Sequence, residues 1–160
     1  MSASPASAKR SDGWVRGYDQ YSDDWDDEGP MQFFPVNKSN AVCLWQKILY
    51  AEGALQADGT KFPESRVTGS FTTYTMQATK NLQKRWGLAV DGEVGPATFG
   101  RAADELIKRD GSTARGKTLY LDYMGDRYGL KIRRNTEGKY LFIDKSGTWR
   151  QAGYDYLTCS

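Results

Sequence analysis

Apolar side chains recur every three or four residues in three stretches between residues 40 and 108, and every second residue in the last third of the chain. The helical spacing predicts helices over residues 40–51, 73–86 and 96–108. The alternating spacing predicts strands over residues 118–123, 129–134 and 139–144, and allows a short fourth strand over 148–150. Short turns join these strands, so the pattern predicts an α+β fold in which three helices precede a small antiparallel β-sheet.

The second predicted helix and the turn after it are the most informative part of the pattern. One face of this helix carries four side chains at four-residue spacing, namely Tyr74, Ala78, Leu82 and Trp86. Thr72 or Thr73 can cap its start, and Gly87 stands where a helix commonly ends. Asp91-Gly92 predicts a tight turn, and Gly95-Pro96 begins the third helix with proline in its first turn.

This stretch resembles the peptidoglycan-binding-domain-like family. The matching residues are Leu82-Gln83, Gly87-Leu88, Val90-Asp91-Gly92, Val94-Gly95-Pro96 and Thr98, with Val42, Trp45-Gln46 and Gly53 in the first helix. The resemblance covers residues 40–110 and implies a small three-helix module that attaches proteins to bacterial peptidoglycan. It therefore implies a non-catalytic, wall-binding function.

A weak internal repeat accompanies the resemblance. Residues 67–75 align with residues 90–98, and in both copies Val-x-Gly leads into a threonine in the first turn of a helix. This similarity predicts two related turn–helix units that share one core. The first copy has Thr68 where the family usually has aspartate.

The chain divides into three predicted segments: an N-terminal arm over residues 1–38, the three-helix module over 39–111 and a small antiparallel β domain over 112–160. Within the module, residues 54–66 form a longer connection than the family usually has. We expect this loop to lie beside the ligand groove, where it would influence specificity. The alternative is a tolerated surface insertion, because loop-closure entropy grows slowly with loop length.

A muropeptide offers sugar faces, amides and carboxylates, so a site for it needs aromatic, amide and cationic side chains. The resemblance implies these ligand-binding candidates: Tyr74, Gln83, Arg85, Trp86, Asp91, Gly92, Gly95 and Thr98. Structural roles compete with this interpretation. Gln83 and Thr98 can satisfy buried backbone groups, Trp86 can belong to the core, and Asp91 can stabilise its own turn.

The chain contains no histidine. This excludes Ser-His and Cys-His nucleophile pairs and histidine-containing zinc sites, so we expect no enzyme, no catalytic residues, no metal and no cofactor. The acidic run over residues 23–28 lacks the spacing of an EF-hand. Cys43 and Cys159 either form one disulfide, which an oxidising compartment would favour, or remain two unpaired thiols.

The arm combines aromatic and acidic side chains over residues 14–28. It would dock either on a protein partner or on the chain's own basic C-terminal part. The aromatic residues of the C-terminal sheet raise a similar choice, because they either fill its core or form a second glycan- or wall-binding surface together with Lys131 and Arg133.

The net charge is only +2, which argues against nucleic acid as a partner. No apolar run reaches the roughly 20 residues of a membrane span, and the first residues have no apolar segment typical of a secretory signal. We expect peptidoglycan as the partner and the cell wall or a phage virion as the location. A structural, tail-associated phage protein that uses the module for protein contacts is the alternative function.

Overall fold

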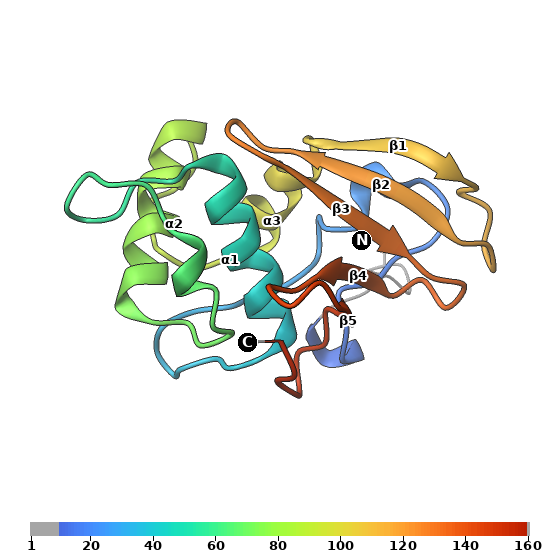
Figure 1. The fold of residues 1–160 in the computed structure, drawn as a ribbon, viewed down its shortest axis with the longest axis horizontal. Coiled ribbons are helices and arrows are strands. Elements are labelled where there is room, and N and C mark those ends of the chain that lie inside the picture. Colours follow the sequence, from blue (N-terminus) through green and yellow to red (C-terminus); the bar gives the residue numbers. More distant parts are fainter. Residues whose placement is uncertain (1–9, 160) are drawn as a thin grey trace, which may run out of the picture.

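The computed structural model describes residues 10–159 (Figure 1). It confirms the α+β class and the order of helices before strands. The helices are α1 (Asn40–Glu52), α2 (Thr73–Trp86) and α3 (Pro96–Ala103), with three-residue 3₁₀ turns η1 (Arg10–Asp12), η2 (Tyr21–Asp23) and η3 (Glu64–Arg66). The strands are β1 (Leu106–Gly111), β2 (Leu119–Met124), β3 (Gly129–Arg134), β4 (Tyr140–Ile143) and β5 (Trp149–Gln151).

The helix ends follow local sequence signals. Ser39 and Thr72 cap α1 and α2, because their hydroxyl oxygens accept hydrogen bonds from the backbone N–H groups three residues later. Gly53 and Gly87 end the same two helices in the left-handed conformation, which glycine adopts without steric cost. Pro96 begins α3 at a position where a missing N–H group is not needed.

Helix α1 lies at the centre of the molecule, between α2 and the sheet (Figure 1). Every residue of α1 except Tyr50 is buried. The indole N–H of Trp45 in α1 donates a hydrogen bond to the Thr79 hydroxyl of α2, and the indole ring packs edge-on against Phe99 of α3. The three helices and the sheet therefore share one hydrophobic core.

The five strands form an antiparallel meander in the order β1-β2-β3-β4-β5. Alternate residues point into the core, as Leu119, Leu121 and Tyr123 of β2 show. Strand β3 continues this inner face with Ile132 and Arg134, both of which are buried.

The predicted end of the third helix at Lys108 was wrong. Helix α3 stops at Ala103, and β1 begins at Leu106. Leu106 and Ile107 fit a helical spacing in the sequence, but Leu106 pairs with Tyr123 of β2 and enters the core from a strand. Pairing with a neighbouring strand thus overrides the local pattern, and the sheet has one strand more than the alternation suggested.

The N-terminal arm packs on its own chain, so the structure shows the second of the two docking alternatives. Trp25 is fully buried, with ring-centroid distances of 4.9 Å to Phe99 and 5.5 Å to Tyr140. The arm also forms backbone hydrogen bonds with the sheet. The N–H group of Val15 donates to the carbonyl oxygen of Ala152, just after β5, and the N–H group of Gly17 donates to that of Gly138, just before β4. We call residues 14–31 the strap. The first nine residues of the predicted tail lie outside the described residues.

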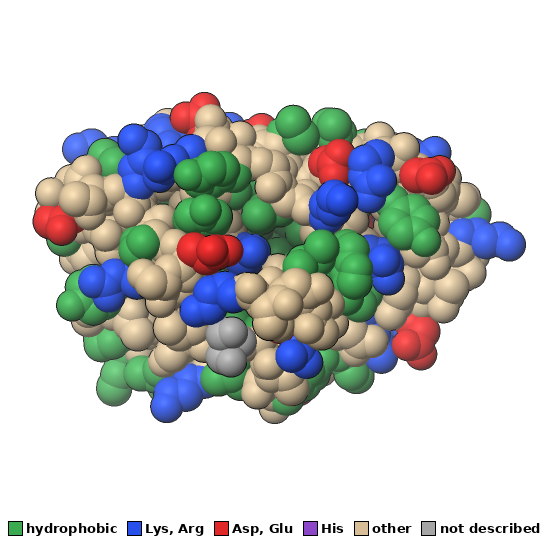
Figure 2. All heavy atoms as spheres, in the orientation of Figure 1, with side chains coloured by type: hydrophobic (Ala, Val, Ile, Leu, Met, Phe, Trp, Pro, Cys, Tyr) green, Lys and Arg blue, Asp and Glu red, His purple; other side chains and the backbone are tan. Residues whose placement is uncertain are grey.

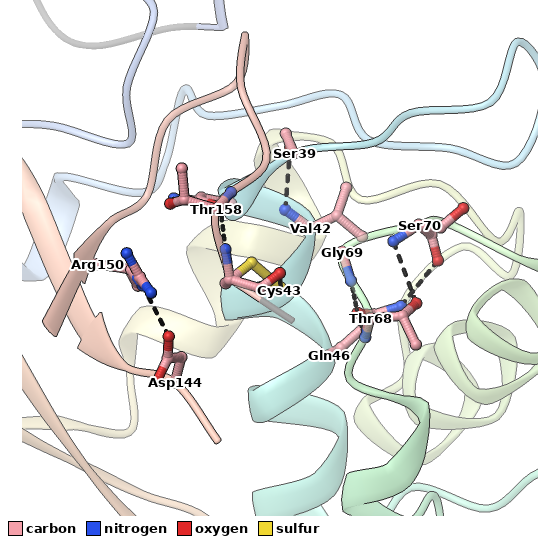
Figure 3. Close-up of a disulfide and its surroundings, with 12 residues drawn as sticks. Ser39, Val42, Cys43, Gln46, Thr68, Gly69, Ser70, Asp144, Arg150 and Thr158 are labelled. Carbon is pink, nitrogen blue, oxygen red and sulfur yellow. Dashed lines mark hydrogen bonds and ion pairs between the residues drawn. A yellow bond between two sulfur atoms is a disulfide. The ribbon is translucent and has the colours of Figure 1, made fainter. Parts of the chain in front are cut away.

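The C-terminal segment covers the start of α1, beside which the chain ends in Figure 1. The backbone N–H groups of Asn40 and Ala41 donate to carbonyl oxygens of Tyr156 and Gly153. The Asn40 carboxamide oxygen accepts hydrogen bonds from the backbone of Thr158 and Cys159. Cys159 is then bonded to Cys43, with a sulfur–sulfur distance of 1.98 Å (Figure 3).

Candidate functional site

Gln83 of α2 organises the turn that carries most of the family's motif. Its Nε2 donates to Asp91, to the carbonyl oxygen of Glu93 and to the Thr98 hydroxyl, each at 2.9 Å. Its Oε1 accepts hydrogen bonds from the backbone N–H groups of Asp91 and Gly92. Because the Gln83 side chain is fully buried and satisfied, it fixes the conformation of residues 91–98.

Gln46 of α1 does the same for the first copy of the repeat. Its Oε1 accepts from the backbone N–H groups of Thr68 and Gly69, and its Nε2 donates to the carbonyl oxygen of Ser70 (Figure 3). The same Nε2 also donates to the Thr75 hydroxyl. The repeat over residues 67–75 and 90–98 is therefore present in three dimensions. Leu157 of the C-terminal segment packs against the first turn, which leaves the second as the more open copy.

A hollow of about 380 Å³ lies beside the second turn. Three of the predicted site residues line it, namely Asp91, Gly95 and Thr98. Asp91 is exposed but bonds within its own turn, where its carboxylate accepts from Gln83 and from the backbone N–H of Glu93. Gly92 is buried beneath Met76 and Lys80. This group of predicted residues is thus held together by hydrogen bonds.

Arg85 lies on the other side of α2, where it is held by Glu52 at the end of α1. One guanidinium nitrogen donates to the Glu52 carbonyl oxygen, and another lies 2.7 Å from the Glu52 carboxylate. Tyr123 donates to the second oxygen of this carboxylate, and burial together with the nearby negative charge raises the pKa of Tyr123, so its hydroxyl stays protonated. The buried Glu52 carboxylate therefore orients the half-exposed Arg85.

Arg85 stands between two hollows. The larger is a groove of about 900 Å³ formed by the end of α1, the loop over residues 54–61, α2 and the turn that carries Asp126 and Arg127. The smaller, of about 400 Å³, is lined by Trp86, Arg101, Glu105 and Met124 in addition to Arg85. The loop after α1 forms one wall of the larger groove. Basic side chains gather over this end of the molecule (Figure 2).

The groove combines the chemical groups that an amide- and carboxylate-rich ligand requires. Four basic side chains line it, namely Lys61, Lys84, Arg85 and Arg127, against the two acidic residues Glu52 and Asp126. Leu55, Leu82, Ala54 and Ala57 supply apolar surface. Asn81 donates to the carbonyl oxygen of Leu55 and so holds the loop against α2. The buried Oε1 of Gln56 has no hydrogen-bond partner among the described residues.

The remaining predicted residues are placed differently. Trp86 is half-buried, and the Arg101 guanidinium lies over its ring at 4.7 Å. Tyr74 is half-exposed and stacks with Arg66 at 3.4 Å, away from both hollows that Arg85 borders. The eight predicted residues therefore divide into the Gln83 turn, the Arg85–Trp86 pair and Tyr74.

Sequence reasoning missed Gln56, Lys61, Asn81, Lys84 and Arg127 as groove residues. Lys84 lies one position before Arg85 on α2 and could have been found from its helix position. Arg127 could not have been found in this way, because it lies in the β2–β3 turn, far from α1 in sequence. A hydrogen bond from its backbone N–H group to the carbonyl oxygen of Ala51 holds it beside α1.

Residues 38–101 match the family described as "putative peptidoglycan binding domain". This segment includes α1, α2, both repeat turns and most of the groove. The chain is also similar to the N-acetylmuramoyl-L-alanine amidase CwlL of Bacillus licheniformis, with 41% identity over 63 residues. That similarity covers 39% of this chain and spans 18% of the amidase. No solved structure matches the chain.

Within residues 10–159, none of the helices has both the length and the apolar character required to cross a bilayer.

Proposed function

We propose that this protein binds bacterial peptidoglycan without cleaving it and that the groove beside Arg85 receives the peptide part of the polymer. The observation that carries the proposal is the position of the groove. All of its lining residues except Asp126 and Arg127 lie within the segment that matches the peptidoglycan-binding family. The protein would accordingly work at the cell wall.

The charges in the groove support a peptide ligand with free carboxylates. Arg85 is oriented by Glu52 before any ligand arrives, so little side-chain entropy is lost when it binds. A planar guanidinium can hold a carboxylate through two parallel hydrogen bonds. Lys84 and Arg127, both exposed, add positive charge without carboxylate partners of their own among the described residues.

The proposal of a non-catalytic role rests on the chemistry that the chain offers. The sequence contains no histidine. The two glutamates that line the hollows beside Arg85 are engaged by arginines, Glu52 by Arg85 and Glu105 by Arg101 at 2.6 Å. A carboxylate paired with an arginine is held in its ionised form, so it is poorly suited to act as a general acid. Such a pair is better suited to orienting the arginine toward a ligand.

The test is co-sedimentation of the full chain with purified insoluble sacculi. We expect binding by the wild type and loss of most of it in the double variant Lys84→Glu/Arg127→Glu, which changes two exposed side chains that support no core contact. Lys117→Glu/Lys145→Glu, which makes the same change of charge at two exposed positions away from the groove, is the matched control. Equal sedimentation of the wild type with and without sacculi would overturn the proposal, as would full binding by the double variant. Release of soluble muropeptides by the pure protein would refute the non-catalytic role.

A further inference from the structure

The face of the sheet that turns away from the helices and the strap carries a row of alternating basic and aromatic side chains. The row consists of Arg109 of β1, Tyr120 of β2, Arg133 of β3 and Trp149 of β5. Tyr120 alternates with the buried residues Leu119 and Leu121, which places it on the outer face. Figure 2 shows basic, acidic and hydrophobic side chains together over these strands.

Arg133 is the centre of the row. Its guanidinium carbon lies 5.5 Å from the centre of the Tyr120 ring and 4.1 Å from that of Trp149. The Arg109 guanidinium carbon lies 6.0 Å from the centre of the Tyr120 ring. Cation–π contacts on two sides restrict the Arg133 side chain to one orientation.

The charge on Arg133 is not neutralised by a carboxylate in the described part of the chain. Its Nε is buried without a hydrogen-bond partner, and its terminal nitrogens have no protein acceptor there and are not enclosed. The neighbouring carboxylate of Asp122 is engaged by Arg109 at 3.2 Å. Lys131 lies opposite Asp122 in the register and two positions from Arg133, so it adds a further cation to the same face. The row therefore presents an oriented anion-binding group between aromatic rings.

Alternation of rings and cations across the strands is suited to a polymer that alternates neutral and acidic units. In the glycan of peptidoglycan, every second sugar has a lactyl carboxyl group, which is free only where no stem peptide is attached. Sugar units can contact the parts of the Tyr120 and Trp149 rings that the guanidinium groups leave uncovered, and a free lactyl carboxylate can take two hydrogen bonds from Arg133. Leu141 and Ile143 of β4 provide apolar surface between them.

We propose that this outer face binds peptidoglycan glycan from which the stem peptides have been removed. This inference rests on the proposed function for the location of the protein at the wall. It concerns a second surface, the outer face of the sheet, and a different ligand. A chain with both surfaces would bind peptide-bearing wall through the groove and stripped glycan through the sheet.

The experiment measures binding of the full chain to soluble glycan strands freed of stem peptides, by isothermal titration calorimetry at low salt. We expect Arg133→Gln and Trp149→Ala each to weaken binding by about tenfold or more, the change that corresponds to loss of one charge-assisted hydrogen bond or one aromatic contact. Lys145→Gln removes one charge from an exposed turn of the same sheet and should change affinity by less than about twofold. Near-ultraviolet circular dichroism checks that the variants fold.

Further arms separate the two surfaces and the two proposals. Glycan whose carboxyl groups have been reduced to alcohols should bind at least about tenfold more weakly than the untreated strands, because the charge is lost. The groove variant Lys84→Glu/Arg127→Glu should bind stripped glycan as the wild type does. Failure of the wild type to bind stripped glycan, or equal binding by Arg133→Gln, would overturn the inference. Loss of glycan binding in the groove variant would place the glycan in the groove instead. If sacculi are not bound but stripped glycan is bound through Arg133, the proposed function fails and this inference stands.

Discussion

Asp24 of the strap and Arg134 of β3 form a buried ion pair, with 2.7 Å between a carboxylate oxygen and a guanidinium nitrogen and each side chain only 2% exposed. Tyr140 donates a further hydrogen bond to the same carboxylate oxygen at 2.6 Å. Arg134 also donates to the carbonyl oxygens of Asp19 and Thr113. This pair fastens the strap to the inner face of the sheet, beside the buried ring of Trp25.

Replacing Asp24 by asparagine should destabilise the protein strongly. The substitution keeps the shape of the side chain but leaves the Arg134 charge buried without its counter-ion, which costs about 3–5 kcal/mol. Chemical denaturation gives the free energy of unfolding. Asp19→Asn is the control, because Asp19 pairs with Arg115 at the surface and an exposed pair contributes at most about 1 kcal/mol. Similar values for the two variants would contradict this account of the strap.

Stability should fall as pH rises from about 4.5 to about 8. Burial raises the pKa of Glu28 to about 8, although hydrogen bonds from Tyr154 and from the Arg16 backbone act in the opposite direction. In this window the folded chain binds more protons than the unfolded chain, so each increase in pH favours unfolding. Above about 8 both states have lost the Glu28 proton, and this contribution becomes constant.

Glu28→Gln tests the origin of that pH dependence. Glutamine retains an oxygen that can accept the Tyr154 hydrogen bond but cannot ionise. The free energy of unfolding, measured by urea titration at several pH values, should therefore depend less on pH between 5 and 8 than in the wild type. Glu137→Gln, at an exposed position, should leave the slope unchanged. An unchanged slope in Glu28→Gln would show that this carboxyl group is ionised in the folded protein.

The two repeat glutamines should contribute similarly to stability. Gln83→Ala removes the partners of three backbone groups and of the buried Thr98 hydroxyl, and we expect a loss of about 2–3 kcal/mol. Gln46→Ala removes the equivalent partners of Thr68, Gly69 and Thr75 and should cost about the same. Thermal and chemical unfolding measure both. Gln77→Ala, on the outer side of α2, should change stability by less than about 0.5 kcal/mol.

Loss of the disulfide should lower stability without changing the fold. The bond joins residues 116 positions apart, and closing so long a loop stabilises the folded state by about 4–5 kcal/mol in the chain-entropy model. The double variant Cys43→Ala/Cys159→Ala should show this difference in denaturant titrations. Reductant should lower the stability of the wild type and leave that of the double variant unchanged. Two free thiols in unreduced, denatured wild type would contradict the bonded state.

How far the sequence predicted the structure depends on the range of the interactions concerned. The caps of α1 and α2, the end of α2 at Gly87 and the start of α3 at Pro96 follow from neighbouring residues, and these were predictable. Strand β1 was not predictable, because Leu106 and Ile107 fit both a helical and a strand spacing, and only pairing with β2 decides between them. The sequence did not decide where Trp25 is buried, because an aromatic ring among carboxylates can pack on a partner protein or on the chain's own basic surface.

The candidate site shows the same distinction. The Gln83 turn is contiguous in sequence and was found from its motif, whereas the groove joins residues from α1, α2 and the β2–β3 turn. Arg85 was identified as a cation on α2, but the residue that orients it, Glu52, lies 33 positions earlier and gave no signal of its own. Contacts over such separations cannot be inferred from spacing along one element.

The bond between Cys43 and Cys159 also determines how the protein would respond to mechanical tension. A pull transmitted between a point before Cys43 and a point at or after Cys159 would pass through the sulfur–sulfur bond rather than along the chain between the two cysteines. Both repeat turns, nearly all of the groove and the whole sheet lie inside that covalent ring and would carry no load along their backbone. The strap lies outside the ring, so it would be the first part to peel away. Tension applied between those two points would thus leave the groove and the outer face of the sheet folded while the strap extends.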